Sequence, residues 1–214
     1  QDVVRLSAHS YCAGLWDADT FGTYQYAEGL RRGVDRLGQL SSVNDGALRL
    51  ERITETNFPH ATQVVDWSHS VGRLWAVANA VYGEGQTTTA AWVQQRKDEL
   101  WAGKVSQVIQ ALGHLDLNHA AYPDQVRQAP GYFRNNRQRM RYPAFRAAGY
   151  PIGSGTVESG AKNVVQQRLR RPGRGWKRQN AQAMLAALAE LRSGRFQWAW
   201  QHVYHPGAPS LPMF

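Results

Sequence analysis

The first third of the chain alternates short runs of β-forming residues with segments whose apolar positions recur at helical spacing. The β-forming runs are residues 3–11, 39–44 and 61–65, and each predicts a strand. Asp17 or Asp19 can cap a helix between the first two runs, and a shorter helical pattern separates the last two. This order of strand, helix, strand, helix, strand predicts parallel pairing, so the fold class that we expect is α/β.

The middle of the chain has helical spacing and no strand-like run. Ser68 or Ser70 can cap a helix that Gly83 ends, and further helices are predicted over residues 90–100 and 104–112. A block of helices therefore follows the last predicted strand, on or beside the sheet.

Proline and glycine divide the remainder of the chain. A loop is predicted around Pro123 and Pro130, and an Arg-rich helix is predicted near residues 132–140. Residues 151–155 form a tight turn before another helix, and an Ala- and Leu-rich helix is predicted over residues 179–192.

Length and composition limit the classes of protein that remain. A chain of 214 residues can bury one good core, or form one domain with a helical insertion. The single cysteine, Cys12, excludes an internal disulfide and a Cys-based zinc site, which suits a reducing cytosol. No apolar run approaches the ~18 residues of a membrane span, and no signal peptide is recognised, so we expect a soluble cytoplasmic protein.

The net charge of +9 points to an anionic partner, and the basic residues are concentrated in one segment. Between residues 134 and 178 there are twelve basic residues and one acid, Glu158. The basic residues are Arg134, Arg137, Arg139, Arg141, Arg146, Lys162, Arg168, Arg170, Arg171, Arg174, Lys177 and Arg178. Aromatic residues, including Trp176, are interleaved with them. Phosphate contacts and stacking platforms favour nucleic-acid binding over an ordinary solvated basic face.

Three carboxylates are candidates for chemistry. Asp45 and Asp66 each end a predicted strand, where ligand sites of α/β sheets lie, and Glu158 falls in the first turn of a helix. Taken singly, Asp45 is equally explained as a turn residue before glycine, and Glu158 as an acid that complements the helix dipole. Together they are typical of a two-metal phosphoryl-transfer site that binds Mg²⁺ or Mn²⁺.

Asp66 and His69 are three residues apart across a predicted strand-to-helix junction. Their side chains can converge on one metal ion, or His69 can pack at the start of the helix. The remaining histidines show no spacing typical of a metal site, and we assign them no role.

Several segments together resemble the ISKra-type transposases of bacterial insertion sequences. The most specific is Tyr-Pro-Ile-Gly-Ser-Gly-Thr-Val-Glu-Ser at residues 150–159, and others are Asn-Asp-Gly-Ala at 44–47 and Val-Val-Asp-Trp-Ser-His at 64–69. The resemblance extends from about residue 3 to residue 200. It implies an RNase H-like fold with a mainly helical insertion, in which the first strands are missing from this chain.

The resemblance also implies a division of the chain. The expected parts are residues 1–67, a core with Asp45 and Asp66; residues 68–148, the helical insertion; residues 149–200, core helices with Glu158; and residues 201–214, a tail.

The activity implied is that of a DDE transposase, which cleaves DNA and transfers strands by two-metal phosphoryl transfer. By the resemblance, Asp45 is the second catalytic aspartate and Glu158 the catalytic glutamate, both ligands of Mg²⁺ or Mn²⁺. Asp66 and His69 match an Asp-x-x-His signature, although an alternative assignment makes Asp66 the second aspartate. The implied partners are transposon-end and target DNA at the bacterial nucleoid, and a second copy of the chain.

The chain departs from the family pattern at three places. Asp2 and Asp17 lack the context of the first catalytic aspartate, so we expect that residue to be missing. Gly160 stands where the family usually has alanine, and Leu48-Arg49 stands where an aromatic and an aliphatic residue are usual. These departures keep two alternatives open: an inactive or repurposed DNA-binding remnant, and a metal-dependent nuclease of the same fold.

Overall fold

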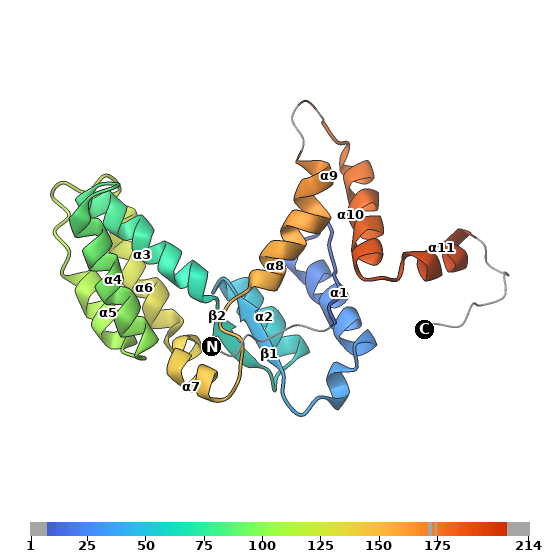
Figure 1. The fold of residues 1–214 in the computed structure, drawn as a ribbon, viewed down its shortest axis with the longest axis horizontal. Coiled ribbons are helices and arrows are strands. Elements are labelled where there is room, and N and C mark those ends of the chain that lie inside the picture. The colour runs from blue at the N-terminus through green and yellow to red at the C-terminus, as the bar shows by residue number, and fades with distance from the viewer. Residues whose placement is uncertain (1–7, 171–172, 174, 205–214) are drawn as a thin grey trace. The chain divides into compact units, whose positions relative to one another are not determined.

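A computed structural model describes residues 8–170, 173 and 175–204 of the chain. Two compact units make up the protein, and each is described by itself (Figure 1). Residues 36–154 form the central unit, while residues 1–35 and 155–214 together form the terminal unit.

The central unit begins with two parallel strands, β1 (Ser41–Asn44) and β2 (Thr62–Val65), joined by the helix α2 (Leu48–Asn57). Ser41 pairs with Thr62 and Asn44 pairs with Val65. The second and third predicted strands and their parallel pairing are therefore confirmed. Within the described residues the fold is mostly helical with this small parallel sheet, which agrees with the α/β class.

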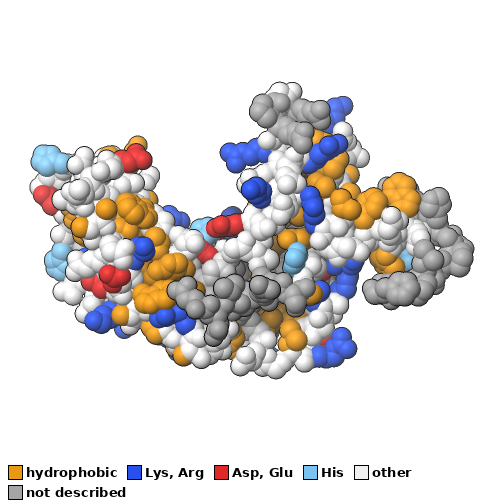
Figure 2. Space-filling view, in the orientation of Figure 1, with side chains coloured by type: hydrophobic (Ala, Val, Ile, Leu, Met, Phe, Trp, Pro, Cys, Tyr) orange, Lys and Arg blue, Asp and Glu red, His pale blue; other side chains and the backbone are white. Residues whose placement is uncertain are grey.

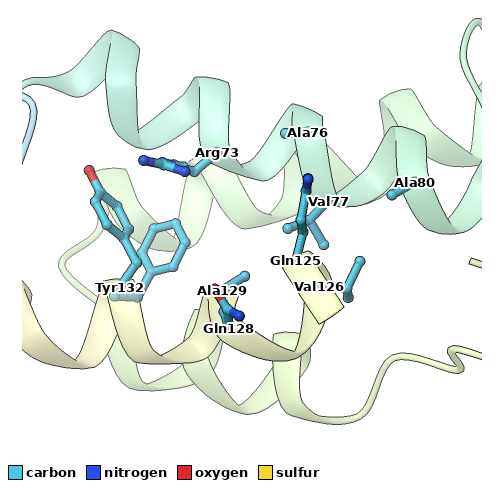
Figure 3. A pocket seen from close by; sticks show the side chains of 10 residues that line it. Arg73, Ala76, Val77, Ala80, Gln125, Val126, Gln128, Ala129 and Tyr132 are labelled. Atoms are coloured by element: carbon cyan, nitrogen blue, oxygen red, sulfur yellow. The ribbon is translucent and has the colours of Figure 1, made fainter. Parts of the chain in front are cut away.

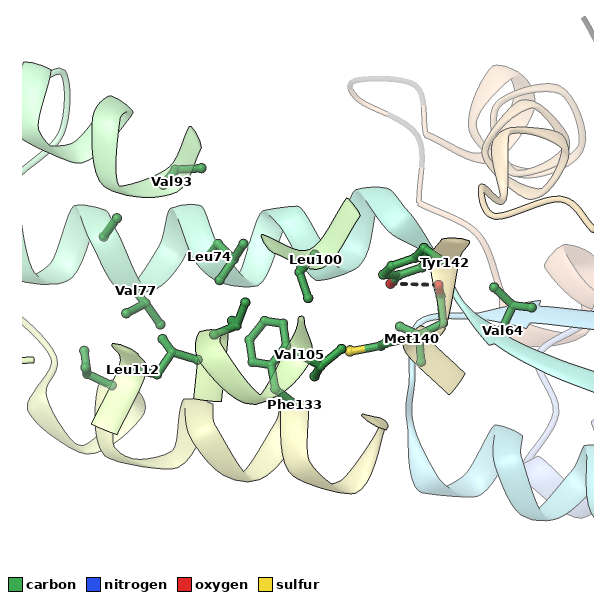
Figure 4. Packing of buried hydrophobic residues seen from close by; sticks show 14 of the residues in the cluster. Val64, Leu74, Val77, Val93, Leu100, Val105, Leu112, Phe133, Met140 and Tyr142 are labelled. Carbon is green, nitrogen blue, oxygen red and sulfur yellow. Dashed lines mark hydrogen bonds between the residues drawn. The ribbon is translucent and has the colours of Figure 1, made fainter. Parts of the chain in front are cut away.

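Four helices follow the sheet and pack around a shared core. They are α3 (Trp67–Tyr82), α4 (Thr87–Trp101), α5 (Val105–Gly113) and α6 (Pro123–Asn135). Each packs against the next, and α6 packs back against α3. Apolar residues three and four positions apart give each helix one buried face. The buried side chains in Figure 4 include Leu74, Val77, Val93, Leu100, Val105, Leu112 and Phe133.

The predicted caps of α3 are wrong. Asp66 caps this helix, because its side chain accepts a hydrogen bond from the amide of His69. Ser70 is fully buried instead, and its hydroxyl lies 2.7 Å from that of Tyr142. Asp66 directly precedes the helix, so its side chain reaches the free amides of the first turn. Ser68 and Ser70 lie inside the helix, so neither acts as the cap.

The loop predicted around Pro123 and Pro130 is also wrong, since both prolines lie in α6. Pro123 is the first residue of the helix, where no amide hydrogen bond is lost. Pro130 lies inside the helix, with the buried side chains of Val126 and Phe133 on either side of it in sequence. Packing of these residues in the core outweighs the hydrogen bond that Pro130 removes.

Two short helices complete the central unit: the 3₁₀ turn η2 (Arg137–Met140) and α7 (Tyr142–Ala147). The predicted Arg-rich helix near residues 132–140 is thus divided between the end of α6 and η2. Tyr142 and Phe145 bury their rings against the core, which explains why the unpredicted helix α7 forms.

The terminal unit contains helices from both ends of the chain. They are α1 (Ala18–Arg31), the 3₁₀ turn η1 (Val34–Arg36) at the border with the central unit, α8 (Gly155–Gly160), the π-helical η3 (Ala161–Gln166), α9 (Gln167–Leu169), α10 (Arg178–Arg192) and α11 (Phe196–Tyr204). Val164, Leu185 and Ala189 form a small core, against which Tyr11 packs. Asp17 caps α1, as predicted.

The strand predicted over residues 3–11 is not confirmed. Residues 3–7 lie outside the described residues, and residues 8–11 do not form a strand. The amide of Tyr11 instead donates a hydrogen bond to the hydroxyl of Ser193 (2.9 Å). No helix in the described part of the chain is long and apolar enough to span a membrane.

Candidate functional site

Asp45 lies in a tight turn that follows β1. The Asn44 side chain accepts a hydrogen bond from the amide of Gly46 (3.0 Å), and Oδ1 of Asp45 accepts one from the amide of Ala47 (2.8 Å). Gly46 has a φ of 82°, and a Cβ atom there would lie 3.0 Å from Oη of Tyr132. Both the backbone conformation and the space available therefore require glycine after Asp45.

Tyr132 provides a second anchor for Asp45. Its hydroxyl donates a hydrogen bond to the Asp45 carbonyl oxygen (3.0 Å). Burial raises the pKa of Tyr132, so the phenol remains a donor at neutral pH. The Asp45 side chain is half-buried, and among the described residues nothing bonds its second oxygen, Oδ2. Asp45 thus has a fixed backbone and one carboxylate oxygen free to bind a ligand.

Asp66, by contrast, is only 1% exposed. Its Oδ1 accepts a hydrogen bond from the amide of His69 (2.8 Å) and lies 3.0 Å from Nδ1 of the His69 ring. Its Oδ2 accepts a hydrogen bond from the amide of Ser154. Next to this contact, the amide of Trp67 donates to the carbonyl oxygen of Ile152 (2.8 Å). Both oxygens of Asp66 are therefore already bonded.

Asp66 is charged at neutral pH despite its burial. Burial raises the pKa of this carboxyl, but the hydrogen bonds from Ser154 and His69 outweigh burial and hold the pKa below its ordinary value. The negative charge is stabilised by the hydroxyl of Ser154, by the backbone amides of His69 and Ser154, and by the ring of His69. This is the environment of an internal anchor rather than of an open binding site.

Glu158 lies in the first turn of α8, in the terminal unit. Its side chain is exposed, and no described residue bonds its carboxylate. After Gly160 the helix continues as the π-helical segment η3, a distortion that is often found at functional sites. Asp45 belongs to the central unit, so the structure describes the two proposed ligands separately.

Tyr11 explains why glycine occupies position 160, where the transposases that the sequence resembles usually have alanine. A Cβ atom at this position would lie 2.6 Å from Cε1 of Tyr11, which is closer than carbon atoms approach one another. The ring of Tyr11 thus occupies the space that the methyl group of an alanine would need.

The predicted DNA-binding residues of the central unit differ in exposure. Arg134, Arg137 and Arg141 are exposed. Arg139 is only 6% exposed, and its guanidinium group pairs with the carboxylate of Glu51 (2.9 Å). Arg139 is therefore an internal ion-pair partner and not a surface group, contrary to the prediction.

The terminal unit carries the larger group of exposed basic residues. Figure 2 shows Lys and Arg side chains gathered over the helices from α8 to α10. The exposed basic residues predicted to bind DNA here are Lys162, Arg168, Arg170, Lys177 and Arg178. Arg171 and Arg174 lie outside the described residues. We call the described group the terminal basic patch.

The start of α10 is suited to an anion. Lys177 is the residue before the helix, and no side chain of the described residues caps the first amides. The N-terminal end of a helix is partly positive, so Lys177 and Arg178 add to the charge there rather than balancing it. Trp176 is half-buried, which leaves only part of its ring accessible for stacking. Arg178 also donates a hydrogen bond to the Leu15 carbonyl oxygen (2.8 Å).

A groove of about 250 Å³ lies between α3 and α6 in the central unit. Figure 3 shows Arg73 of α3 facing Tyr132 of α6, with the guanidinium carbon 5.1 Å from the centre of the ring. Gln125 and Gln128 add polar groups to a lining that is otherwise largely apolar. The groove borders the residue that anchors Asp45 but does not include either candidate aspartate.

Across residues 8–170, 173 and 175–204, no group of three or more His, Cys, Asp or Glu side chains is arranged to hold a metal ion. Asp45, Glu158 and His69 remain as separate groups with available donor atoms.

Comparison with known proteins gives no match. No protein-family model, no curated protein and no solved structure is similar to this chain. The residues of the site and the segments quoted above are therefore the basis for any functional proposal.

The sequence did not indicate the polar contacts that support the two aspartates. Tyr132 donates a hydrogen bond to Asp45, and Ser154 donates one to Asp66. The carbonyl oxygen of Ile152 accepts one from Trp67, the residue after Asp66. In each case the two partners are distant in the chain. No local pattern marks such partners, because the contacts exist only after the chain has folded.

Proposed function

We propose that this chain is part of a DDE-type transposase catalytic domain with an RNase H-like core. The observation that carries the proposal is the state of Asp45, which follows a parallel strand and has an anchored backbone. One of its carboxylate oxygens has no bonding partner among the described residues. The specific block at residues 150–159, with Glu158 exposed in the first turn of its helix, supports the same reading.

The same geometry favours Asp45 over Asp66 as the second catalytic aspartate. Asp66 is buried and accepts hydrogen bonds on both oxygens. A metal ion would have to displace at least one of these bonds, which costs more inside the protein than at the half-exposed Asp45. Asp45 and Glu158 are therefore the proposed ligands.

Carboxylate oxygens are the donors that Mg²⁺ and Mn²⁺ prefer, so the two proposed residues fit these ions. A divalent ion bound there supplies charge stabilisation for the attacking and leaving oxygens of a phosphodiester. The protein's own part is to hold Asp45 through the bonds from Ala47 and Tyr132.

The proposed substrate is DNA, both transposon ends and target, bound in the bacterial cytoplasm at the nucleoid. The terminal basic patch and the uncapped start of α10 provide phosphate-binding groups. Arg134 and Arg137 of the central unit are further exposed candidates, whereas Arg139 is left out because it is buried. Assembly with a second copy of the chain is part of the same proposal.

The metal sites are tested by Mn²⁺ binding, measured by electron paramagnetic resonance. We expect Asp45→Asn and Glu158→Gln each to weaken Mn²⁺ binding by about tenfold or more, since each removes a charged ligand. Glu84→Gln is the control, because Glu84 is an exposed acid outside the proposed site. Unchanged Mn²⁺ affinity in both site variants contradicts the proposal.

The DNA surface is tested by charge reversal of Lys162, Arg168 and Arg170 to glutamate. We expect weaker duplex binding and a shallower dependence of affinity on salt. The control reverses three exposed charges elsewhere, Arg36, Arg49 and Arg52. Equal losses in the two triple variants would contradict a specific basic surface.

Product analysis separates the alternatives. Cleavage followed by strand joining supports a transposase, while hydrolysis without joining supports a nuclease of the same fold. Binding without cleavage in the presence of Mg²⁺ supports a DNA-binding remnant. Strand joining, hydrolysis and binding are all followed with one labelled DNA duplex.

A further inference from the structure

The buried carboxylate of Asp66 joins two segments that are far apart in the chain. Oδ1 caps α3 by binding the amide of His69, whereas Oδ2 binds the amide of Ser154, 88 positions away in sequence. The neighbouring bond between the amide of Trp67 and the carbonyl oxygen of Ile152 (2.8 Å) holds the same two segments together.

A helix cap alone does not require this arrangement. Asp17 caps α1 through one bond to the amide of Thr20 (2.8 Å), and its side chain is exposed. Asp66 caps α3 with one oxygen and uses the other for the distant contact to Ser154. A charged group that is fully bonded in a buried setting holds its partners more firmly than one at the surface.

Ser154 lies directly before the helix α8, so its contact with Asp66 restrains the start of that helix. Ser154 is buried and is the last residue of the central unit, and α8 begins at Gly155. Glu158 follows in the first turn of that helix. The carboxylate of Asp66 therefore restrains the backbone immediately before the helix that carries the proposed metal ligand.

We propose that Asp66 is a positioning residue that fixes the chain at its entry into α8. This inference rests on the proposed function only where it concerns Glu158 as a ligand, since the restraint on Ser154 is a property of the fold. Asp66 acts through Ser154 and binds neither metal nor DNA. The resemblance assigned Asp66 either to a signature or to the catalytic set, and the bonds on both of its oxygens give it this third role.

His69 has a smaller part in the restraint. Its backbone amide binds Asp66 whatever the side chain is, while its ring lies 3.0 Å from the same oxygen and is half-exposed. We therefore expect His69→Ala to leave the bond to Ser154 in place.

The test measures hydrogen exchange of the Ser154 amide by NMR in the full chain, without metal or DNA. Asp66→Asn preserves the shape of the side chain but replaces one acceptor oxygen with a donor nitrogen. We expect exchange at Ser154 to be on the order of tenfold faster, as for the loss of one hydrogen bond to a charged group. Asp17→Asn is the matched control and is expected to leave this amide unchanged.

A general loss of stability is distinguished by other amides in the same spectra. If Asp66 only stabilises the fold, exchange in α5 should accelerate as much as at Ser154, and that outcome overturns the proposal. Ser154→Ala provides a second variant that keeps the backbone amide and removes only the hydroxyl, which also interacts with Asp66. It should give a smaller acceleration at the same amide.

The link to the proposed function is tested separately with Mn²⁺. Asp66→Asn should weaken Mn²⁺ binding by several-fold, less than Asp45→Asn does, because it moves a ligand without removing one. If the wild-type chain binds no Mn²⁺ but Ser154 exchange still rises in Asp66→Asn, the proposed function fails and the restraint stands. If Ser154 exchange is unchanged, the positioning role is wrong whatever the metal does.

Discussion

Gly46 and Gly160 are each required by a side chain that faces them, and each lies within two residues of a proposed functional residue. Gly46 follows Asp45 and faces Tyr132, while Gly160 follows Glu158 by two positions and faces Tyr11. Their backbone conformations differ, because Gly46 has a positive φ and Gly160 has an ordinary helical backbone.

For Gly46→Ala we expect a loss of more than about 1–2 kcal/mol, the cost of placing a side chain in the left-handed region, because the new Cβ also crowds Tyr132. Gly85→Ala is the matched control, with a φ of 75° and no atom within 4 Å of the added carbon. Urea unfolding measures both. Equal losses would show that crowding by Tyr132 adds nothing.

For Gly160→Ala we expect destabilisation, although alanine is intrinsically the better helix former by about 1 kcal/mol. The reason is the overlap with the ring of Tyr11. In a Tyr11→Ala background the same change should become stabilising. A double-mutant cycle from urea unfolding checks this reversal, and additive effects would contradict it.

At the scale of elements, an ionic cluster joins α1 to the end of α10. Arg195 pairs with Glu28 of α1 and Glu190 of α10, each at 2.9 Å. Arg31 lies farther from both acids, at 3.3 and 3.7 Å, and is half-exposed. Arg195 is thus the central group of the cluster.

We expect Arg195→Gln to destabilise the terminal unit by about 2 kcal/mol at neutral pH, and Arg31→Gln by less than about 1 kcal/mol. The hydrogen bond from Arg195 lowers the pKa of Glu190 below its ordinary value. A lowered folded-state pKa adds stability above the unfolded value of 4.5, and this stability is lost as the pH falls through the folded value. The free energies of unfolding of the wild type and of Arg195→Gln, measured in urea, should therefore converge at acid pH. A difference that stays constant with pH would contradict the role of the cluster.

Helices and strands were predictable where the pattern within one element decides them. The second and third strands, α2 and the helices α3 to α5 follow from local spacing of apolar residues. The course of α6 through Pro130 was not predictable, because it depends on burial of Val126 and Phe133 against other helices. The cap of α3 depended on which of several polar side chains stands next to the helix.

At the scale of the whole molecule, the two units differ in the size of their cores. Among the described residues, the hydrophobic cluster of the central unit contains fifteen buried side chains, and the cluster of the terminal unit contains three. Stability within a protein follows the local density of buried apolar contacts. The terminal unit is therefore expected to open more easily.

We expect amides of α10 to exchange at least about tenfold faster than those of α5, a difference of about 1.4 kcal/mol in opening free energy. Low concentrations of urea should unfold the terminal unit first. Hydrogen exchange followed by mass spectrometry checks this order. Simultaneous exchange of both units would show that they unfold as one.

The candidate site was predictable as a set of residue types and positions, but not as an arrangement. Asp45 at the end of a strand and Glu158 in the first turn of a helix are local features, and the structure has both. The burial of Arg139 beside Glu51 could not be predicted, because an arginine in a basic segment has the same local pattern whether it is exposed or paired.

The sequence by itself determined the parallel strand pair, most helices and the Asp-Gly turn after β1, because each depends on residues within a few positions of one another. Only the tertiary structure decided which acids are free. Within the described part of the chain, one carboxylate oxygen of Asp45 has no partner, whereas Asp66 accepts a hydrogen bond from the distant amide of Ser154. The reason is that hydrogen-bond partners and burial are set by chain segments brought together in folding, which local patterns do not record.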